Sequence, residues 1–181
     1  MNIIDIIKNK GIILYPTDTI WGIGGDATSK EVIEKIYKIK KRAPEKSMLI
    51  LVDSYKMLQS YVESIPHEIW EILAKSEKPT TVIYSNPKNL PKELLAKNGS
   101  IAIRIVKEGF AKDLIKHLQL PLISTSANRS GSPSPINFDE ITDEILQNVD
   151  YVVNLHRETS TNKASRIIKW SKEHGVEIIR N

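Results

Sequence analysis

Three short stretches of this chain of 181 residues carry side chains whose types and spacing could bind a charged ligand. The first, "YPTDTIWGIGGDA" at residues 15–27, takes an apolar run into hydroxyl and carboxylate residues and then glycines. The second, "YKIKKRAPEK" at residues 37–46, concentrates lysine and arginine. The third, "STSANRSGSPSP" at residues 124–135, is a polar stretch that follows the apolar "LQLPLI". Cations, hydroxyls and exposed backbone N–H groups are common ligands of phosphates and other anions.

Each stretch also has a plain structural interpretation. Threonine and aspartate after a strand often cap a turn, and Ser/Gly/Pro content alone is typical of a loop. A run of charge often covers a solvated helix face, but Lys40 and Arg42 lie at the exit of a predicted helix, directly before the apolar "SMLILV". There arginine would give a forked contact to a phosphate and lysine a point charge. Because ligands usually bind at strand ends of an open α/β sheet, the three stretches together favour a binding site.

Several familiar kinds of catalytic site are missing from the sequence. There is no GxxxxGKS/T phosphate loop and no GxGxxG opening a helix, since the spacing of "GIGGDA" fits neither. No GxSxG elbow is present. The chain has no cysteine, and its histidines lack metal-ligand spacing and are interpreted as surface residues. They are His67, His117, His156 and His174. Catalysis would therefore depend on positioning and charge rather than on a protein nucleophile.

Short apolar runs alternate with amphipathic segments along the chain. We predict strands in "GIILYP", "SMLILV", "TTVIYS", "SIAIRIV", "LPLIS", "YVVNL", "SRIIKW" and "VEIIR". We predict helices over residues 29–41, 55–62, 67–75, 110–118 and 138–146, the first with a capping box from Thr28 to Glu31. This order favours α/β architecture with a mixed sheet. The length and the 40% hydrophobic content suit a single domain over residues 1–181.

The net charge of +4 leaves two interpretations open. It could attract anionic partners, or it could reflect a lysine-rich solvated surface. The N-terminus lacks the pattern of a signal peptide, and no window approaches the length of a membrane span. Together with the absence of cysteine, these features predict a cytoplasmic protein that does not contact a membrane.

Four segments, in order, resemble the YrdC-like threonylcarbamoyl-AMP synthase family. "YPTDTIWGIGGDA" resembles its strand-exit motif, "KIKKRAPEKSMLILV" its KxR segment, "SIAIRIV" the strand with its internal arginine, and "LISTSANRSG" its SxN segment. The resemblance covers nearly the whole chain and is to the short, single-domain form of the family. It implies a YrdC-like twisted mixed sheet flanked by helices, with a basic concave cleft.

The resemblance also implies an activity. Family members condense L-threonine, bicarbonate and ATP, with Mg²⁺ bound to the ATP, into threonylcarbamoyl-AMP and pyrophosphate. The product is passed to downstream threonylcarbamoyl-transferase machinery, which modifies an adenosine of certain tRNAs. Two alternatives remain: a protein of this fold that binds tRNA or double-stranded RNA without making the adenylate, and a carbamoyl-transferring module. The presence of both KxR and SxN favours the synthase.

Roles can be inferred where residues match the family motifs. The implied catalytic residues are Lys40, Arg42, Ser126 and Asn128. The implied threonine-binding residues are Thr17, Arg104, Ser124 and Ser165. The implied ATP-binding residues are Lys40, Arg42, Ser100, Ser126, Ser134 and Arg180. Among these, Arg104 would pair with the carboxylate of threonine and Asn128 would help to order the site. No metal ligand from the protein is implied.

Overall fold

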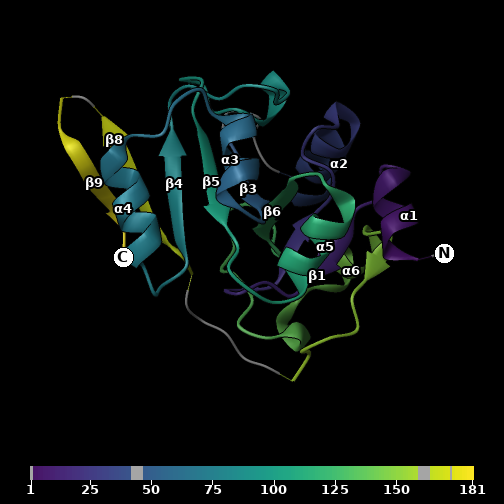
Figure 1. The fold of residues 1–181 in the computed structure, drawn as a ribbon. Coiled ribbons are helices and arrows are strands. Elements are labelled where there is room, and N and C mark those ends of the chain that lie inside the picture. The colour runs from purple at the N-terminus through teal and green to yellow at the C-terminus, as the bar shows by residue number, and fades with distance from the viewer. Residues whose placement is uncertain (1, 42–46, 159–163, 172) are drawn as a thin grey trace.

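A mixed sheet of nine strands organises the part of the chain that the computed structural model describes, which is residues 2–41, 47–158, 164–171 and 173–181. The spatial order is β7-β1-β2-β6-β3-β5-β4-β8-β9, with β9 at one edge (Figure 1). The strands are β1 (Ile13–Tyr15), β2 (Gly22–Gly24), β3 (Leu49–Val52), β4 (Thr80–Tyr84), β5 (Ile101–Ile105), β6 (Leu122–Ser126), β7 (Tyr151–Val152), β8 (Arg166–Ser171) and β9 (Gly175–Arg180).

The sheet combines parallel and antiparallel neighbours. The pairs β1–β7, β3–β5 and β4–β8 are parallel, and the other neighbours are antiparallel. Each of the eight predicted apolar runs overlaps a strand, which confirms the predicted mixed α/β fold. The ninth, β2, was not predicted because it has three residues, two of them glycines. Gly24 is required there, since a Cβ on it would lie 1.9 Å from the carbonyl oxygen of Ile123 in β6.

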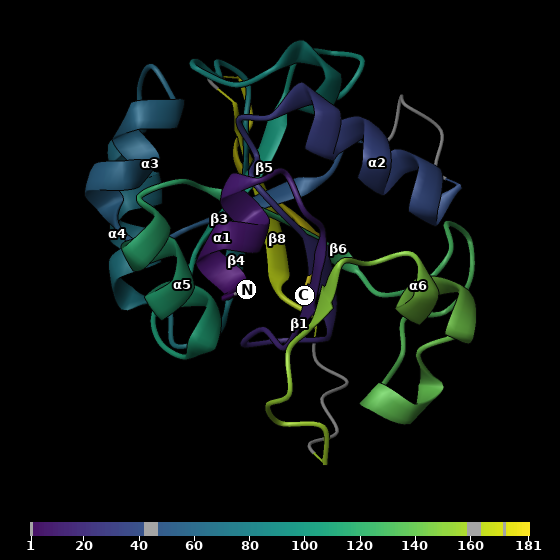
Figure 2. The same cartoon turned by 90° about the vertical axis from the view of Figure 1, so that its right-hand side faces the viewer.

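Helices cover both faces of this sheet. They are α1 (Ile3–Lys8), α2 (Lys30–Lys40), α3 (Tyr55–Tyr61), α4 (His67–Lys75), α5 (Phe110–Leu118) and α6 (Asp143–Gln147), with short 3-10 helices η1 (Lys92–Leu94) and η2 (Phe138–Glu140). Figure 2 shows α2 and α5 on opposite sides of the sheet. Alternation along β1 explains this, because Leu14 packs into the core cluster that contains α2, while Ile13 and Tyr15 pack into the cluster that contains α1 and α5.

Two helix predictions need correction. Ser29, not Thr28, is the N-cap of α2, and its hydroxyl accepts from the backbone N–H of Val32 at 3.4 Å. Thr28 is instead bonded to the carboxylate of Asp26 through both its N–H and its hydroxyl. The helix predicted over residues 138–146 is divided into η2 and α6, because Ile141 is buried in the core and the chain there is extended.

The N-terminal helix α1 was not predicted. Its N-cap is Asn2, whose side chain accepts from the backbone N–H of Asp5 at 2.9 Å. Six residues are too few to show a helical period in the sequence. Within the residues that the structure describes, no helix has the length and apolar character needed to cross a membrane.

Candidate active site

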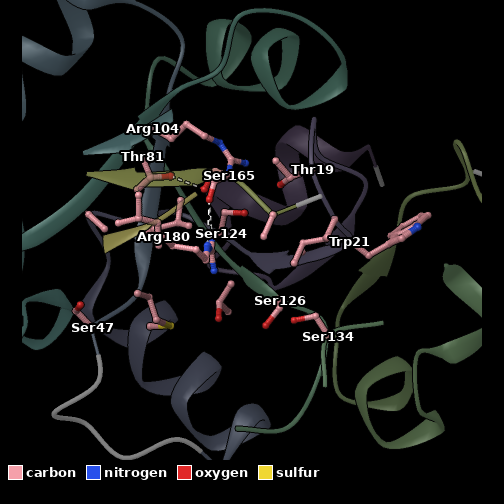
Figure 3. Close-up of a pocket in the computed structure, with 18 of the residues that line it drawn as sticks. Thr19, Trp21, Ser47, Thr81, Arg104, Ser124, Ser126, Ser134, Ser165 and Arg180 are labelled. Atoms are coloured by element: carbon pink, nitrogen blue, oxygen red, sulfur yellow. Dashed lines mark hydrogen bonds between the residues drawn. The ribbon is translucent and has the colours of Figure 1, made fainter. Parts of the chain in front are cut away.

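A cavity of about 370 Å³ is lined by residues of seven neighbouring strands, β2, β6, β3, β5, β4, β8 and β9, and of the loops beside them (Figure 3). Six of the residues implied as site residues line it: Arg104, Ser124, Ser126, Ser134, Ser165 and Arg180. They come from strands and loops up to 76 positions apart, from residue 104 to residue 180. The charged residues among the described lining are both arginines, and the remaining polar side chains there are serines and threonines together with Trp21.

Arg104 is the most deeply buried cation of the cavity wall. Its side chain is 2% exposed, and its Nη2 donates to Oδ1 of Asp18 at 2.8 Å. Its Nε is buried and has no hydrogen-bond partner. Burial lowers the pKa of Arg104, and the nearby carboxylate of Asp18 opposes that shift. A guanidinium has five N–H donors, so Arg104 retains donors for an anionic ligand.

Thr17 lies behind the cavity rather than in its lining. Its Oγ1 accepts from the backbone N–H groups of Thr19 and Ile20 at 3.1 and 3.2 Å, and is 2.8 Å from the carbonyl oxygen of Ile20. Thr17 therefore fixes the turn between β1 and β2, and Thr19 supplies the hydroxyl that lines the cavity. Sequence reasoning missed both Thr19 and Asp18, although both belong to the "PTDT" that it singled out.

Lys40 ends α2 with its side chain almost completely buried, at 1% exposure. Its Nζ donates to the carbonyl oxygens of Ser126 and Asn128, the second at 2.6 Å. The backbone N–H of Ser130 returns a bond to the carbonyl oxygen of Lys40 at 2.9 Å. Lys40 is not in the cavity lining. Its bonds join the KxR segment to the SxN loop on the side away from the cavity. Arg42 lies outside the described residues.

Asn128 also contacts its own loop. Its Nδ2 donates to the carbonyl oxygens of Arg129 and Ser132, while its Oδ1 is buried without a hydrogen-bond partner. Outside the loop, Glu144 of α6 contacts both motif segments, with Oε1 2.9 Å from Lys41 Nζ and Oε2 3.1 Å from Arg129 Nε. These contacts hold the segment after β6 in place beside Ser126.

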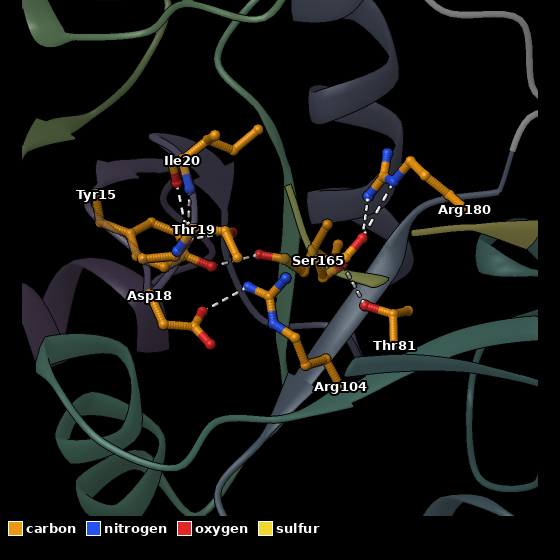
Figure 4. A network of polar contacts seen from close by, with 10 residues as sticks. Tyr15, Asp18, Thr19, Ile20, Thr81, Arg104, Ser165 and Arg180 are labelled. Carbon is orange, nitrogen blue, oxygen red and sulfur yellow. Dashed lines mark hydrogen bonds and ion pairs between the residues drawn. The ribbon is translucent and has the colours of Figure 1, made fainter. Parts of the chain in front are cut away.

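A second polar network fixes the opposite wall (Figure 4). The hydroxyls of Thr81 and Ser165 are 2.8 Å apart, and Nε and Nη2 of Arg180 donate to the carbonyl oxygen of Ser165 at 3.1 and 2.8 Å. Arg180 thus lines the cavity with its orientation set by the residue that directly precedes β8. Ser100 lies apart from this network, in an open hollow of about 480 Å³ that shares Ser47 and other lining residues with the cavity.

Tyr15 supports the floor of the site. Its hydroxyl donates to the carbonyl oxygen of Ile123 at 3.0 Å, and complete burial raises its pKa, so the phenol stays protonated. The cavity therefore offers guanidinium and hydroxyl donors, held by buried contacts, to a ligand with negative charge. In the part of the chain that the structure describes, no group of three or more His, Cys, Asp or Glu side chains could hold a metal ion.

Residues 5–181 match the family model of Sua5, YciO and YrdC proteins, which carries the description "Telomere recombination". The threonylcarbamoyl-AMP synthase of Pseudoalteromonas translucida is 31% identical over 145 residues, covering 78% of this chain and 78% of that protein. A protein of Methanocaldococcus jannaschii, named provisionally as a threonylcarbamoyl-AMP synthase, is 34% identical over 174 residues, covering 95% of this chain and 80% of that protein.

Solved structures share the fold. Sua5 of P. abyssi in complex with L-threonine superimposes with a TM-score of 0.86 and 20% identity, covering 98% of this chain and 52% of that one. This chain therefore spans about half the length of that Sua5 chain. YciO of E. coli superimposes with a TM-score of 0.80 and 23% identity, covering 98% of this chain and 86% of that one.

Proposed function

The chain belongs to the Sua5/YciO/YrdC family, and on that premise we propose that it is a threonylcarbamoyl-AMP synthase. Its substrates would be L-threonine, bicarbonate and ATP, and its products threonylcarbamoyl-AMP and pyrophosphate. The observation that carries the proposal is the 34% identity, over 95% of this chain, to a relative named for this activity. The donor groups of the cavity support it, because all three substrates carry negative charge.

The two arginines suggest how the substrates would be arranged. Arg104 lies at the end of the cavity near Thr19, whereas Ser126 and Ser134 lie at the other end (Figure 3). Arg104 would receive the carboxylate of threonine, since guanidinium binds carboxylate through a planar fork. Arg180 and the hydroxyls of Ser126 and Ser134 would receive the phosphates of ATP. Lys40 would support the phosphate end by holding the loop on which Ser126 and Asn128 lie.

The reaction needs no protein nucleophile. The amine of threonine and bicarbonate would form a carbamate and water. A carbamate oxygen would then attack the α-phosphorus of ATP, and the bond from that phosphorus to the bridging oxygen would break to release pyrophosphate. The residues of this chain would orient the two substrates and offer donors to the developing negative charge, which are the main needs of phosphoryl transfer.

Mg²⁺ would enter as its complex with ATP. The oxygen donors near the phosphate end are neutral hydroxyls, such as those of Ser126 and Ser134. Such a site fits an ion held mainly by phosphates and water rather than by a cage of carboxylates. When bound, the ion would neutralise part of the charge on the phosphates. The product would pass to a downstream transferase that modifies tRNA.

The direct test is an assay of the purified protein with ATP, Mg²⁺, labelled bicarbonate and each amino acid in turn. We expect labelled threonylcarbamoyl-AMP and an equal amount of pyrophosphate with threonine. Arg104→Met should abolish threonine-dependent release, while Arg166→Met, on β8 but outside the cavity lining, should leave it unchanged. If no amino acid supports product formation while RNA binds tightly, the protein is an RNA-binding member of the fold instead.

A further inference from the structure

Arg104 is held at one of its five N–H donors. Nη2 donates to Oδ1 of Asp18, and Nε is buried without a partner. A long side chain with several rotatable bonds loses much rotamer entropy when it is fixed. A buried guanidinium also needs a counter-charge, since an unpaired buried charge is strongly unfavourable. The contact with Asp18 provides both the fixed direction and the counter-charge.

Asp18 is itself fixed before any ligand binds. It lies in the turn between β1 and β2, where the hydroxyl of Thr17 accepts from the backbone N–H groups of Thr19 and Ile20. Its side chain is 18% exposed. The turn therefore places the carboxylate opposite β5, 86 positions further along the chain, where Arg104 projects from the sheet (Figure 4).

Asp18 does not line the main cavity. It lines a neighbouring hollow of about 260 Å³ together with Lys107 and Glu108. A ligand in the main cavity would therefore meet the guanidinium and not the carboxylate. Any influence of Asp18 on that ligand must act through Arg104.

The contact between Asp18 and Arg104 uses one oxygen and one nitrogen. A forked contact would occupy two donors on one edge of the guanidinium. The single bond leaves the other terminal N–H groups of the guanidinium for a second carboxylate, whereas Nε is buried and has no partner. The geometry thus combines one fixed anchor with an unoccupied set of donors.

We propose that Asp18 is a positioning residue for substrate binding: its hydrogen bond holds the guanidinium of Arg104 so that the remaining donors receive the substrate carboxylate. This inference rests on the proposed function, in which Arg104 binds the carboxylate of threonine. It assigns to the aspartate of "PTDT" a role at the amino-acid end of the cavity and none at the phosphate end.

Steady-state kinetics of Asp18 variants test the proposal. Asp18→Ala should raise KM for threonine at least about tenfold, which corresponds to about 1.4 kcal/mol, with little change in kcat or in KM for ATP. Asp18→Asn should restore part of the affinity, because the amide oxygen can still accept from Nη2 of Arg104 although it supplies no counter-charge. Asp113→Ala is the matched control, since Asp113 is exposed on α5, away from the cavity.

A second measurement does not depend on turnover. In ¹⁵N-arginine-labelled protein, the Nε–H resonance of Arg104, assigned by its loss in Arg104→Lys, should be sharp and slow to exchange with water. Asp18→Ala should broaden it, and Asp18→Asn should leave it sharp. Threonine should shift it in the wild-type protein. If Asp18→Ala broadens the resonance but threonine never shifts it, the positioning contact exists and the proposed substrate is wrong.

Three outcomes would overturn the proposal. One is a folded Asp18→Ala protein with an unchanged KM for threonine. Another is an Asp18→Asn protein that is folded and as impaired as Asp18→Ala, because the hydrogen bond would then not be the operative contact. The third is an Arg104 resonance that does not change in any Asp18 variant. Thermal unfolding identifies any variant that fails to fold. If Asp18→Ala does not fold, the kinetics and the Arg104 resonance of Asp18→Asn test the proposal instead.

Discussion

Replacing the buried Lys40 by methionine tests how the two motif segments cooperate. Methionine keeps much of the volume of lysine but cannot donate, so the carbonyl oxygens of Ser126 and Asn128 lose their bonds to Nζ. A hydrogen bond to a charged group contributes about 1.5–3 kcal/mol, so the two together contribute at least about 3 kcal/mol to the order of this loop. The desolvation cost of the buried ammonium is recovered at the same time, so global stability should fall by less than this.

The expected effect on activity follows from the same free energy. Since about 1.4 kcal/mol corresponds to a factor of ten, loss of about 3 kcal/mol from the ordered loop should lower kcat/KM about 100-fold. Threonine-dependent pyrophosphate release measures this. Hydrogen exchange of the backbone N–H of Ala127 and Ser130, which donate to carbonyl oxygens of Trp21 and Lys40, measures the loop directly. Both amides should exchange faster in Lys40→Met.

Lys38→Met is the matched control, because Lys38 is an exposed lysine one half-turn earlier in the same helix. It should retain both turnover and amide protection. The reasoning fails if Lys40→Met loses turnover while the loop amides stay as protected as in the wild type. That result would mean that Lys40 acts on the substrates themselves. Unchanged turnover with a folded protein would remove Lys40 from the site altogether.

Three further substitutions probe other parts of the site. Arg180→Met should raise KM for ATP about tenfold or more and KM for threonine much less, since a charge-assisted bond is worth about 1.5–3 kcal/mol; equal effects on both constants would contradict the proposed arrangement. Glu144→Gln should lower the melting temperature at neutral pH and not in acid. The bond from Lys41 depresses the pKa of Glu144, so its stabilisation is present above the unfolded-state pKa and lost as pH falls through the folded-state pKa; a pH-independent difference would show that charge is not involved. Gly24→Ala should reduce the free energy of unfolding in urea by about 3 kcal/mol or more, because its Cβ would meet a backbone oxygen at 1.9 Å; near-native stability would be the contrary result.

Much of the fold could be predicted because the spacing of apolar residues along the chain indicates its strands and helices. The apolar runs and the amphipathic face of α2 are properties of neighbouring residues, and each predicted run overlaps a strand. The strand β2 could not be found this way. Its two glycines lack the side chains of a strand, and the reason for Gly24 is a backbone oxygen in β6, about 100 positions away.

The candidate site, like the fold, could be predicted only in part. Residues that match a motif could be placed near one another in advance, and six of them line one cavity. What each side chain contacts could not be predicted. Lys40 carries a charge typical of a phosphate ligand, but its Nζ bonds loop carbonyls. Asp18 could be taken for a turn residue, and its ion pair appears only when Arg104 is brought opposite to it by the sheet.

The wall that contains Ser165 and Arg180 also has a consequence for synthesis of the protein. Strand β4 pairs on one side with β5 and on the other with β8, which begins 86 positions after β4 does, at Arg166 rather than Thr80. While the chain is still emerging from the ribosome, β4 therefore has an unpaired edge that could join another chain. The pairing that covers this edge is also the one that brings Ser165 to Thr81. A nascent chain thus acquires its ligand cavity and loses its exposed sheet edge in a single late step.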